Sequence, residues 1–181
     1  ALQTPLFLLQ AADASSPPMP MVVAKKIMNK ANPKNTGGVH GMLPAHLGMK
    51  IRLLEGLDLG NDWVKDAAGE VVNIAVNPLD QDEVDAAMAS GTSIVDLRHL
   101  PLGVWVRMDT YIGAPFCQKL RRHCDTLLPG HTQSLVYIET RTSDAFIFRE
   151  HTVVRTSFPF SHGRVELPQH VKVGPCGQES S

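Results

Sequence analysis

The chain has 181 residues, a mass of 19.7 kDa and a formal net charge of −1. Hydrophobic residues make up 43% and charged residues 19%, a composition typical of a globular protein, which excludes collagen-like, coiled-coil and intrinsically disordered chains. Because the chain is nearly neutral, a nucleic-acid partner would have to be met by a local basic patch rather than by a global field.

The first 38 residues alternate between weak structure signals and breaks. Residues 13–20 (DASSPPMP) cannot continue a helix, because proline lacks the amide donor and restricts the residue before it. Residues 23–30 favour a short helix, and residues 32–38 (NPKNTGG) are typical of an exposed turn. We therefore expect 1–38 to form a loosely ordered arm.

From Met49 onward the pattern changes to short runs with a period of two. In MKIRLLE the apolar side chains of Met49, Ile51 and Leu53 alternate with Lys50 and Arg52, as in a half-buried strand. Similar runs predict seven strands, at 49–55, 70–77, 92–98, 103–109, 134–141, 145–150 and 151–158. Short strands at this spacing favour a small β-barrel or sandwich.

Two helices are predicted between these strands. Residues 82–89 (DEVDAAMA) begin with acids and end just before Gly91, which are helix start and stop signals. Pro115 precedes residues 116–128, whose apolar side chains fall on one helical face. The predicted fold class is mainly β with helical decorations (α+β).

The three cysteines have no C-x-x-C pair. Cys117, His123, Cys124 and His131 are zinc-ligand types, but structural zinc sites pair their cysteines at closer spacing, so we expect buried free thiols. A thiol enzyme using Cys117 or Cys176 is an alternative, but nothing in the sequence places a base beside either thiol.

The cellular location is expected to be intracellular, in a reducing compartment. An odd number of unpaired cysteines fits the cytoplasm or the nucleus better than a disulfide framework. No apolar stretch reaches the roughly 18 residues of a membrane-spanning helix, so no membrane partner is expected.

Basic side chains on the predicted strands, together with aromatic side chains, are the remaining functional signal. Lys50, Arg52, Arg107 and Arg141 are the candidate phosphate contacts, and Trp63 is the candidate for base stacking. Single-stranded nucleic acids are bound by such a combination. The alternative is that the aromatic residues belong to the core and that the cations form a solvated face.

Three segments resemble PIF-type and RecD-like superfamily-one DNA helicases, in the order found in that family. The first is 43–77, where an apolar strand leads through Leu-Asp to a Gly-x-Val segment, although Lys65-Asp66 replaces an expected Asn-Gly. Its matching positions are Gly48, Leu57, Asp58, Val64, Gly69, Val71 and Val72.

The second and third segments are 100–116 and 153–165. The second matches through Val106, Asp109, Tyr111 and Gly113, and the third through Arg155, Phe158, Pro159 and Phe160. Together the three segments cover residues 43–165.

The resemblance implies a small SH3-like β-barrel over 39–165, inserted in the second motor domain of a helicase and helping to hold single-stranded DNA. The parent family uses ATP and magnesium, and the resemblance implies a role in DNA repair and recombination. This sequence has no G-x-x-x-x-G-K-[ST] loop, so we expect no bound cofactor and no ATPase activity from this chain.

We therefore interpret the chain as a fragment or degenerate relative of a PIF-like helicase. Residues 166–181 lack the motor motif that would follow in the family, and we expect a disordered tail there. The expected partners are single-stranded DNA, bound weakly, and the missing motor domains. The alternative from another class is a stand-alone protein-interaction β-barrel with no nucleic-acid role.

Overall fold

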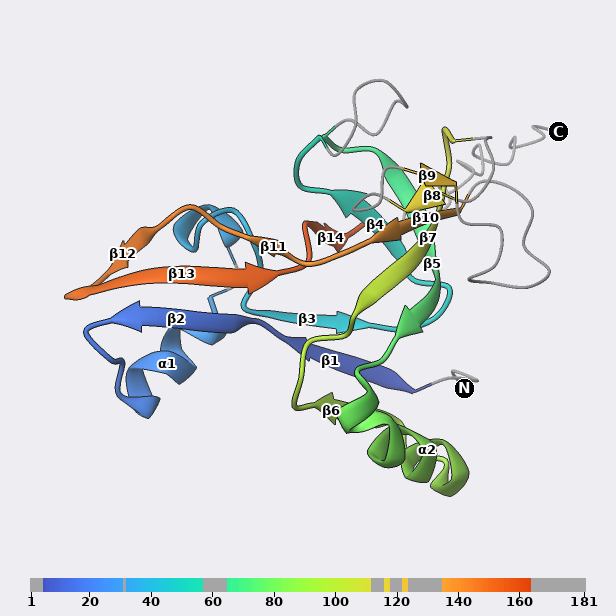
Figure 1. Cartoon of the computed structure of the whole chain (residues 1–181), viewed down its shortest axis with the longest axis horizontal. Coiled ribbons are helices and arrows are strands. Elements are labelled where there is room, and N and C mark those ends of the chain that lie inside the picture. Colours follow the sequence, from blue (N-terminus) through green and yellow to red (C-terminus); the bar gives the residue numbers. More distant parts are fainter. Residues whose placement is uncertain are drawn as a thin grey trace, which may run out of the picture.

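The computed structural model describes residues 5–30, 32–56, 65–111 and 135–163, together with the backbone of 116–117 and 122–123. Over these ranges the fold is mainly β, and its α-helices are α1 (Met21–Met28) and α2 (Gln81–Ser90) (Figure 1). Short 3-10 helices occupy Pro33–Asn35 and Pro78–Asp80. The mainly β class with helical decorations is confirmed.

The largest sheet has seven strands in the order β14-β4-β5-β7-β10-β8-β9. Their bounds are β4 (Lys50–Leu53), β5 (Ala68–Ala75), β7 (Gly103–Met108), β8 (Phe116–Cys117), β9 (Arg122–His123), β10 (Leu135–Ile138) and β14 (Phe160–His162). Only the β10–β8 pair is parallel. A bulge between Val71 and Asn73 shifts the register of β5 against β7, which increases the local twist of the sheet.

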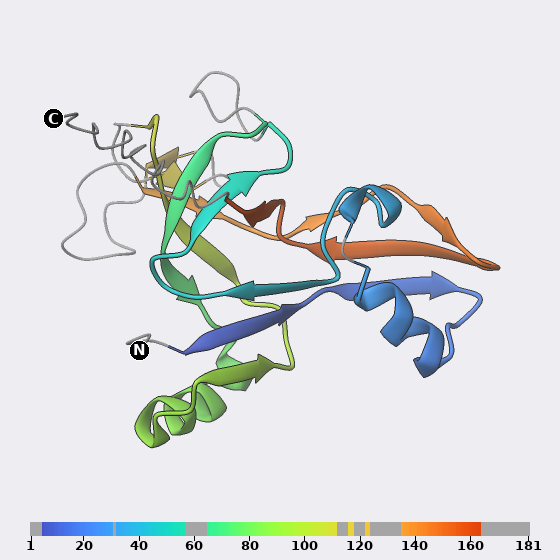
Figure 2. The ribbon, with the colours of Figure 1, turned by 180° about the vertical axis from the view of Figure 1, so that it is seen from behind.

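Two smaller sheets complete the β structure. One has the order β3-β1-β6, with β1 (Leu6–Gln10) antiparallel to β3 (Met42–Ala45) and parallel to β6 (Ile94–Leu97). The other contains β2 (Ala12–Ser16), β11 (Arg141–Thr142), β12 (Phe146–Phe148) and β13 (His151–Ser157). In this sheet β13 pairs with the other three strands. In both views the paired strands β13 and β2 form a two-stranded ribbon that extends away from the other two sheets (Figure 1 and Figure 2).

The main hydrophobic core is shared by the three-stranded sheet and one face of the seven-stranded sheet. Phe7 and Leu9 of β1 pack in the same buried cluster as Ile51 of β4 and Val106 of β7. Val84 is the buried residue of α2 and joins this cluster. One face of β4, β5 and β7 therefore packs into this main core, and the opposite face includes a second, smaller buried cluster around Trp105 and Leu135.

All seven strands predicted from period-two patterns are present, as β4, β5, β6, β7, β10, β12 and β13. The helix predicted at 82–89 is α2, which has acids in its first turn and Gly91 at its C-terminal cap with φ of 69°. Glycine adopts this left-handed conformation without steric cost. The helix predicted at 23–30 corresponds to α1, shifted by two residues.

The helix predicted at 116–128 differs from the structure. Residues 116–117 and 122–123 are strands β8 and β9, which pair with each other, and β8 also pairs with β10. The pairing of β8 with β9 and with β10 has here overridden a local helical pattern. Cys117 therefore lies on a strand, and the side chains of Cys117, Cys124 and Cys176 lie outside the described residues.

The structure also differs from the loose order expected in the first segment. Within 5–30, β1 and β2 pair with later strands and Ile27 of α1 is fully buried. These pairings are not visible locally, because LFLLQ is a continuous apolar run without alternation. The boundaries 1–38, 39–165 and 166–181 stay predictions, and 164–181 lies outside the described residues.

The pairings of the described strands give open sheets and no closed barrel. The SH3-like barrel itself stays a prediction.

Candidate nucleic-acid interface

Three charged side chains lie side by side across β4, β5 and β7. Lys50 pairs with Glu70, and Glu70 in turn pairs with Arg107. Directly paired residues of neighbouring strands point to the same face of a sheet. Because Ile51 and Val106, next to them in sequence, are in the core, this row lies on the opposite face, which we call the outer face.

Lys50 and Glu70 form an ion pair on the outer face. The distance from Nζ of Lys50 to Oε2 of Glu70 is 2.9 Å, and their side chains are 53% and 33% exposed. The hydrogen bond to Glu70 raises the pKa of Lys50 above its usual value and outweighs burial, which lowers it. The charge of Asp109 also raises this pKa, and that of Arg107 lowers it. These four groups therefore share one electrostatic environment.

Arg52 adds a further cation to the outer face, on the same strand as Lys50. It lies two residues after Lys50 on β4, so it points to the same face, and it pairs with Ser161 of β14 and Ala68 of β5. Arg52 and Arg107 are exposed, and neither forms an ion pair within the described residues. They are two cations available to an anionic ligand.

The aromatic side chains of the outer face form a separate apolar cluster. The ring centroids of Trp105 and Tyr137 are 4.9 Å apart, and Trp105 and Leu135 are buried against Val72. Trp105 is only 4% exposed, so it cannot stack on a base. For this residue the expectation that the aromatic residues belong to the core is confirmed.

The other two candidate residues are not joined to the outer face in the described structure. Arg141 lies on β11 in the four-stranded sheet, where its Nη1 forms an ion pair with Oε2 of Glu55. Trp63 lies outside the described residues. The structure therefore brings together three of the five candidates, Lys50, Arg52 and Arg107.

Sequence reasoning missed a buried carboxylate paired with a histidine. Asp80, 2% exposed, accepts hydrogen bonds from the backbone N of His99 at 2.8 Å and from its Nδ1 at 2.7 Å. Burial alone would raise the pKa of Asp80, but these hydrogen bonds and the charges of His99 and Arg98 outweigh it and lower the pKa. These hydrogen bonds hold the chain after β6 against the start of α2, and no local sequence motif predicts them.

Among the described residues, no group of three or more His, Cys, Asp or Glu side chains could hold a metal ion. None of the described helices is long and apolar enough to cross a membrane.

No family model and no curated protein matches the sequence. Among solved structures, the Pif1 helicase from Candida albicans has a TM-score of 0.46 and 13% identity, covering 89% of this chain and 30% of that chain. Unliganded Pif1 from Bacteroides sp. has a TM-score of 0.41 and 12% identity, covering 87% and 32%.

A Bacteroides Pif1 helicase in complex with ADP-AlF3 and ssDNA has a TM-score of 0.37 and 13% identity, covering 86% and 23%. The chain thus spans about a third or less of the length of these three helicases. Likeness of this degree does not establish the family of the chain.

Proposed function

We propose that the chain is a helicase-related β-module that binds single-stranded DNA weakly through the outer face of the seven-stranded sheet. The observation that carries the proposal is that Lys50, Arg52 and Arg107 share one face of adjacent strands, and that Arg52 and Arg107 form no ion pair in the described part of the chain. The three segments that resemble PIF-like helicases, including the SH3-like region they imply, support the same reading.

Cations on a strand face suit the phosphates of an extended single strand. Neighbouring strands lie about 5 Å apart and alternate residues of a strand about 7 Å apart. Three basic side chains on this lattice offer two or three contacts to successive phosphates. Such contacts provide affinity without sequence readout.

Two acids on the outer face lower the expected strength of DNA binding. Glu70 occupies Lys50, and the charge of Asp109 also acts on Lys50. A ligand phosphate competes with Glu70 for Lys50, so we expect weak binding carried mainly by Arg52 and Arg107. For Trp63 and Arg141 a role in binding stays a prediction.

The test is a fluorescence titration of a short labelled single strand at several salt concentrations. For the unaltered chain the log of the binding constant should fall with the log of the salt concentration, with a slope of about −0.7 for each phosphate contacted. Replacing Arg52 and Arg107 together by Gln should reduce the magnitude of that slope by about 1.4.

Arg98→Gln serves as a control, because Arg98 is exposed and its ion pair with Glu83 lies on α2, away from β4. No binding at low salt, or equal losses in the control and in the double variant, would contradict the proposal. Absence of any salt-dependent DNA binding would favour the protein-interaction module instead.

The remaining parts of the proposal concern the chain as a piece of a motor protein. We propose that it has no ATPase activity of its own and needs no ATP or magnesium to bind DNA, because the phosphate-loop sequence is missing. We also propose an intracellular location, with the motor domains of a helicase as a further partner.

A further inference from the structure

An open groove of about 460 Å³ is lined by residues of α2, β5 and β1, and we call it the α2 groove. Its buried lining includes the side chains of Phe7, Ile74 and Val84, each 6% exposed. Met88 of α2 and Leu47 also line it and are 50% and 37% exposed. Apolar surface therefore continues from the main core to the solvent, in a volume that can hold apolar side chains of a partner.

The α2 groove is acidic on the side of α2. Asp85 lines the groove, and Asp82 lies three residues earlier on the same side of the helix. Asp85 accepts a hydrogen bond from Gln81 at 2.8 Å, but neither aspartate forms an ion pair within the described residues. Glu83 is paired with Arg98, and α2 contains no Lys or Arg. The groove therefore suits an occupant that combines apolar side chains with positive charge.

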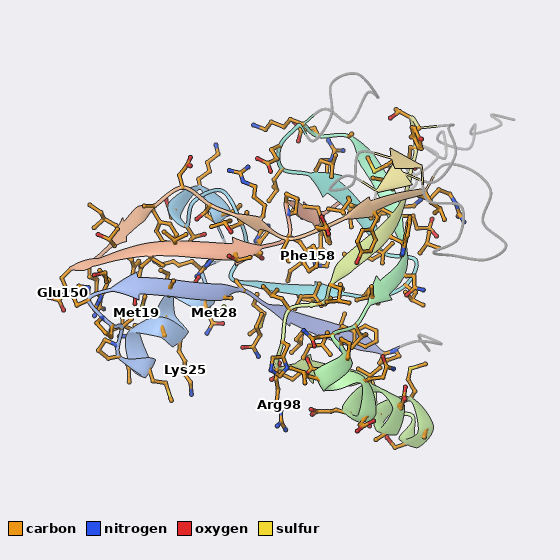
Figure 3. All side chains as sticks on the ribbon, in the orientation of Figure 1. Met19, Lys25, Met28, Arg98, Glu150 and Phe158 are labelled. Atoms are coloured by element: carbon orange, nitrogen blue, oxygen red, sulfur yellow. The ribbon has the colours of Figure 1, made fainter. Side chains whose placement is uncertain are left out.

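The exposed side of α1 has this combination. Met21 and Val22 are 73% and 66% exposed. Lys25 and Lys26 are exposed as well and lie one helical turn after them, so the four side chains share one side of the helix. Lys25 extends from the side of α1 that faces away from the β2–β13 ribbon (Figure 3). We call these four residues the α1 strip.

The α1 strip is exposed because the other side of the helix is used for packing. Ile27 is fully buried, and Val23 and Ala24 are partly buried. The carbonyl oxygen of Ile27 accepts a hydrogen bond from Arg155 of β13. The two lysines of the strip form no ion pair in the part of the chain that the structure describes. The fold thus holds two apolar side chains and two cations out in the solvent.

The α1 strip and the α2 groove of one chain lie apart. α1 lies beside β2, on the ribbon, whereas α2 lies beside β6 (Figure 1 and Figure 2). In this fold the two surfaces can therefore meet only between two copies of the chain. Because they are different surfaces, the contact is of the head-to-tail kind, which closes into a ring or extends along a row of copies.

A lipid surface is the competing class of partner for the α1 strip. A helix that lies in a membrane interface inserts a continuous apolar face. In α1 that face, with Val23 and Ile27, packs against the protein. A membrane would also leave the α2 groove without an occupant, since acids at a groove oppose anionic lipid headgroups. The complementary charges of the strip and the groove favour a second copy.

We propose that the α1 strip of one copy docks into the α2 groove of a second copy, so that the chain self-associates. The apolar side chains of the strip contact the apolar lining of the groove, and its lysines face Asp82 and Asp85. Small interfaces are weak and transient, so association should appear at high protein concentration. The inference does not depend on DNA binding by the outer face, and its test uses no nucleic acid.

Sedimentation velocity over a wide range of protein concentrations measures the association. The average sedimentation coefficient of the unaltered chain should rise with concentration, and less steeply at high salt, because salt screens the charge pairs. Met21→Ser with Val22→Ser should weaken association by about tenfold or more, since burial of each apolar side chain contributes at least that factor. Ile147→Ser is the control, because Ile147 is 78% exposed on β12 and belongs to neither surface.

Charge reversal tests whether the strip meets the groove. Lys25→Glu with Lys26→Glu makes the strip acidic, and Asp85→Lys places a cation in the groove. Each altered chain alone should associate more weakly than the unaltered chain, because its strip and its groove now repel each other. A mixture of the two should form one-to-one pairs, since the unaltered strip of the second chain fits the unaltered groove of the first. Far-ultraviolet circular dichroism shows that each altered chain is folded.

Weaker association of each altered chain, with recovery in the mixture, supports the inference. A chain that stays monomeric at the highest concentration, or association weakened equally by Ile147→Ser, would overturn it. A mixture that associates no better than its components would also overturn it, because the strip and the groove would then not meet. Binding of anionic lipid vesicles by a monomeric chain, lost in Met21→Ser with Val22→Ser, would overturn it in favour of a membrane partner.

Discussion

The guanidinium of Arg155 on β13 forms two hydrogen bonds with the carboxylate of Asp13 on β2, from Nε to Oδ1 and from Nη2 to Oδ2, each 2.6 Å long. The two side chains are 0% and 9% exposed. The residues are 142 positions apart in the sequence. The pair therefore fastens the N-terminal ribbon to the last part of the chain.

Removing one partner of this buried pair should be strongly destabilising. Arg155→Ala leaves the Asp13 carboxylate buried without its cation, which costs about 3–5 kcal/mol in such sites. We expect the free energy of unfolding, measured by urea titration, to fall by that amount. Arg98→Ala, which removes an exposed 3.4 Å pair with Glu83, should cost about 0–1 kcal/mol. Equal effects of the two substitutions would show that Arg155 has no special role.

This pair also shows what could be predicted from the sequence. Alternation of apolar and polar side chains is a local property, so β4, β5 and β7 could be predicted. Strand β2 (ADASS) has almost no apolar side chains, and it is stabilised by pairing with β13 and by the Asp13–Arg155 contact. Such long-range stabilisation leaves no local signal.

The candidate site was predictable to a similar degree. Alternation places Lys50 and Arg52 on the polar face of one strand, and Arg107 on the polar face of another. Their proximity depends on the β4–β5–β7 pairing. The neutralising position of Glu70 depends on that register as well, and a shift by one residue would have moved it to the other face.

Gly41 should tolerate no larger residue. A Cβ atom at this position would collide with the carbonyl oxygen of Met28 and lie 2.8 Å from Nη1 of Arg155. Because both neighbours are held by packing, we expect Gly41→Ala to lower the free energy of unfolding by about 1–3 kcal/mol.

Gly91→Ala separates crowding from backbone strain. Nothing lies within 4 Å of the added Cβ there, but φ is +69°, so the cost should be that of a left-handed residue, about 1–2 kcal/mol.

Gly41→Ala should disturb Arg155, so combining it with Arg155→Ala should cost less than the sum of the two single effects. Strict additivity in urea unfolding would argue against the contact.

Asp80 should make the protein less stable in acid. Its pKa in the folded state is lowered, so its contribution is fully present above the ordinary pKa of an aspartic acid, about 4. The contribution is lost as the pH falls through the lower folded-state pKa. We expect unaltered protein to exceed Asp80→Asn in stability at neutral pH, and this difference to shrink as the pH falls below about 4.

Denaturant unfolding at a series of pH values measures this difference. Asp82→Asn is a suitable control, because Asp82 is exposed in the first turn of α2 and its pH dependence should be slight. A difference between Asp80→Asn and unaltered protein that stays constant down to strongly acidic pH would mean that the Asp80 carboxylate is not stabilised by His99.

Removing the acid of the Lys50–Glu70 pair should strengthen single-strand binding. In Glu70→Gln the ammonium of Lys50 is released from its 2.9 Å partner and becomes available to a phosphate, so the salt slope should steepen by about 0.7.

Glu83→Gln is the matched control, since it removes the same charge from an ion pair on α2. Titration of one labelled single strand with both variants distinguishes a local effect from a change in net charge. If both bind more tightly by the same factor, Lys50 makes no direct contact, and if neither does, the outer face is not where the strand binds.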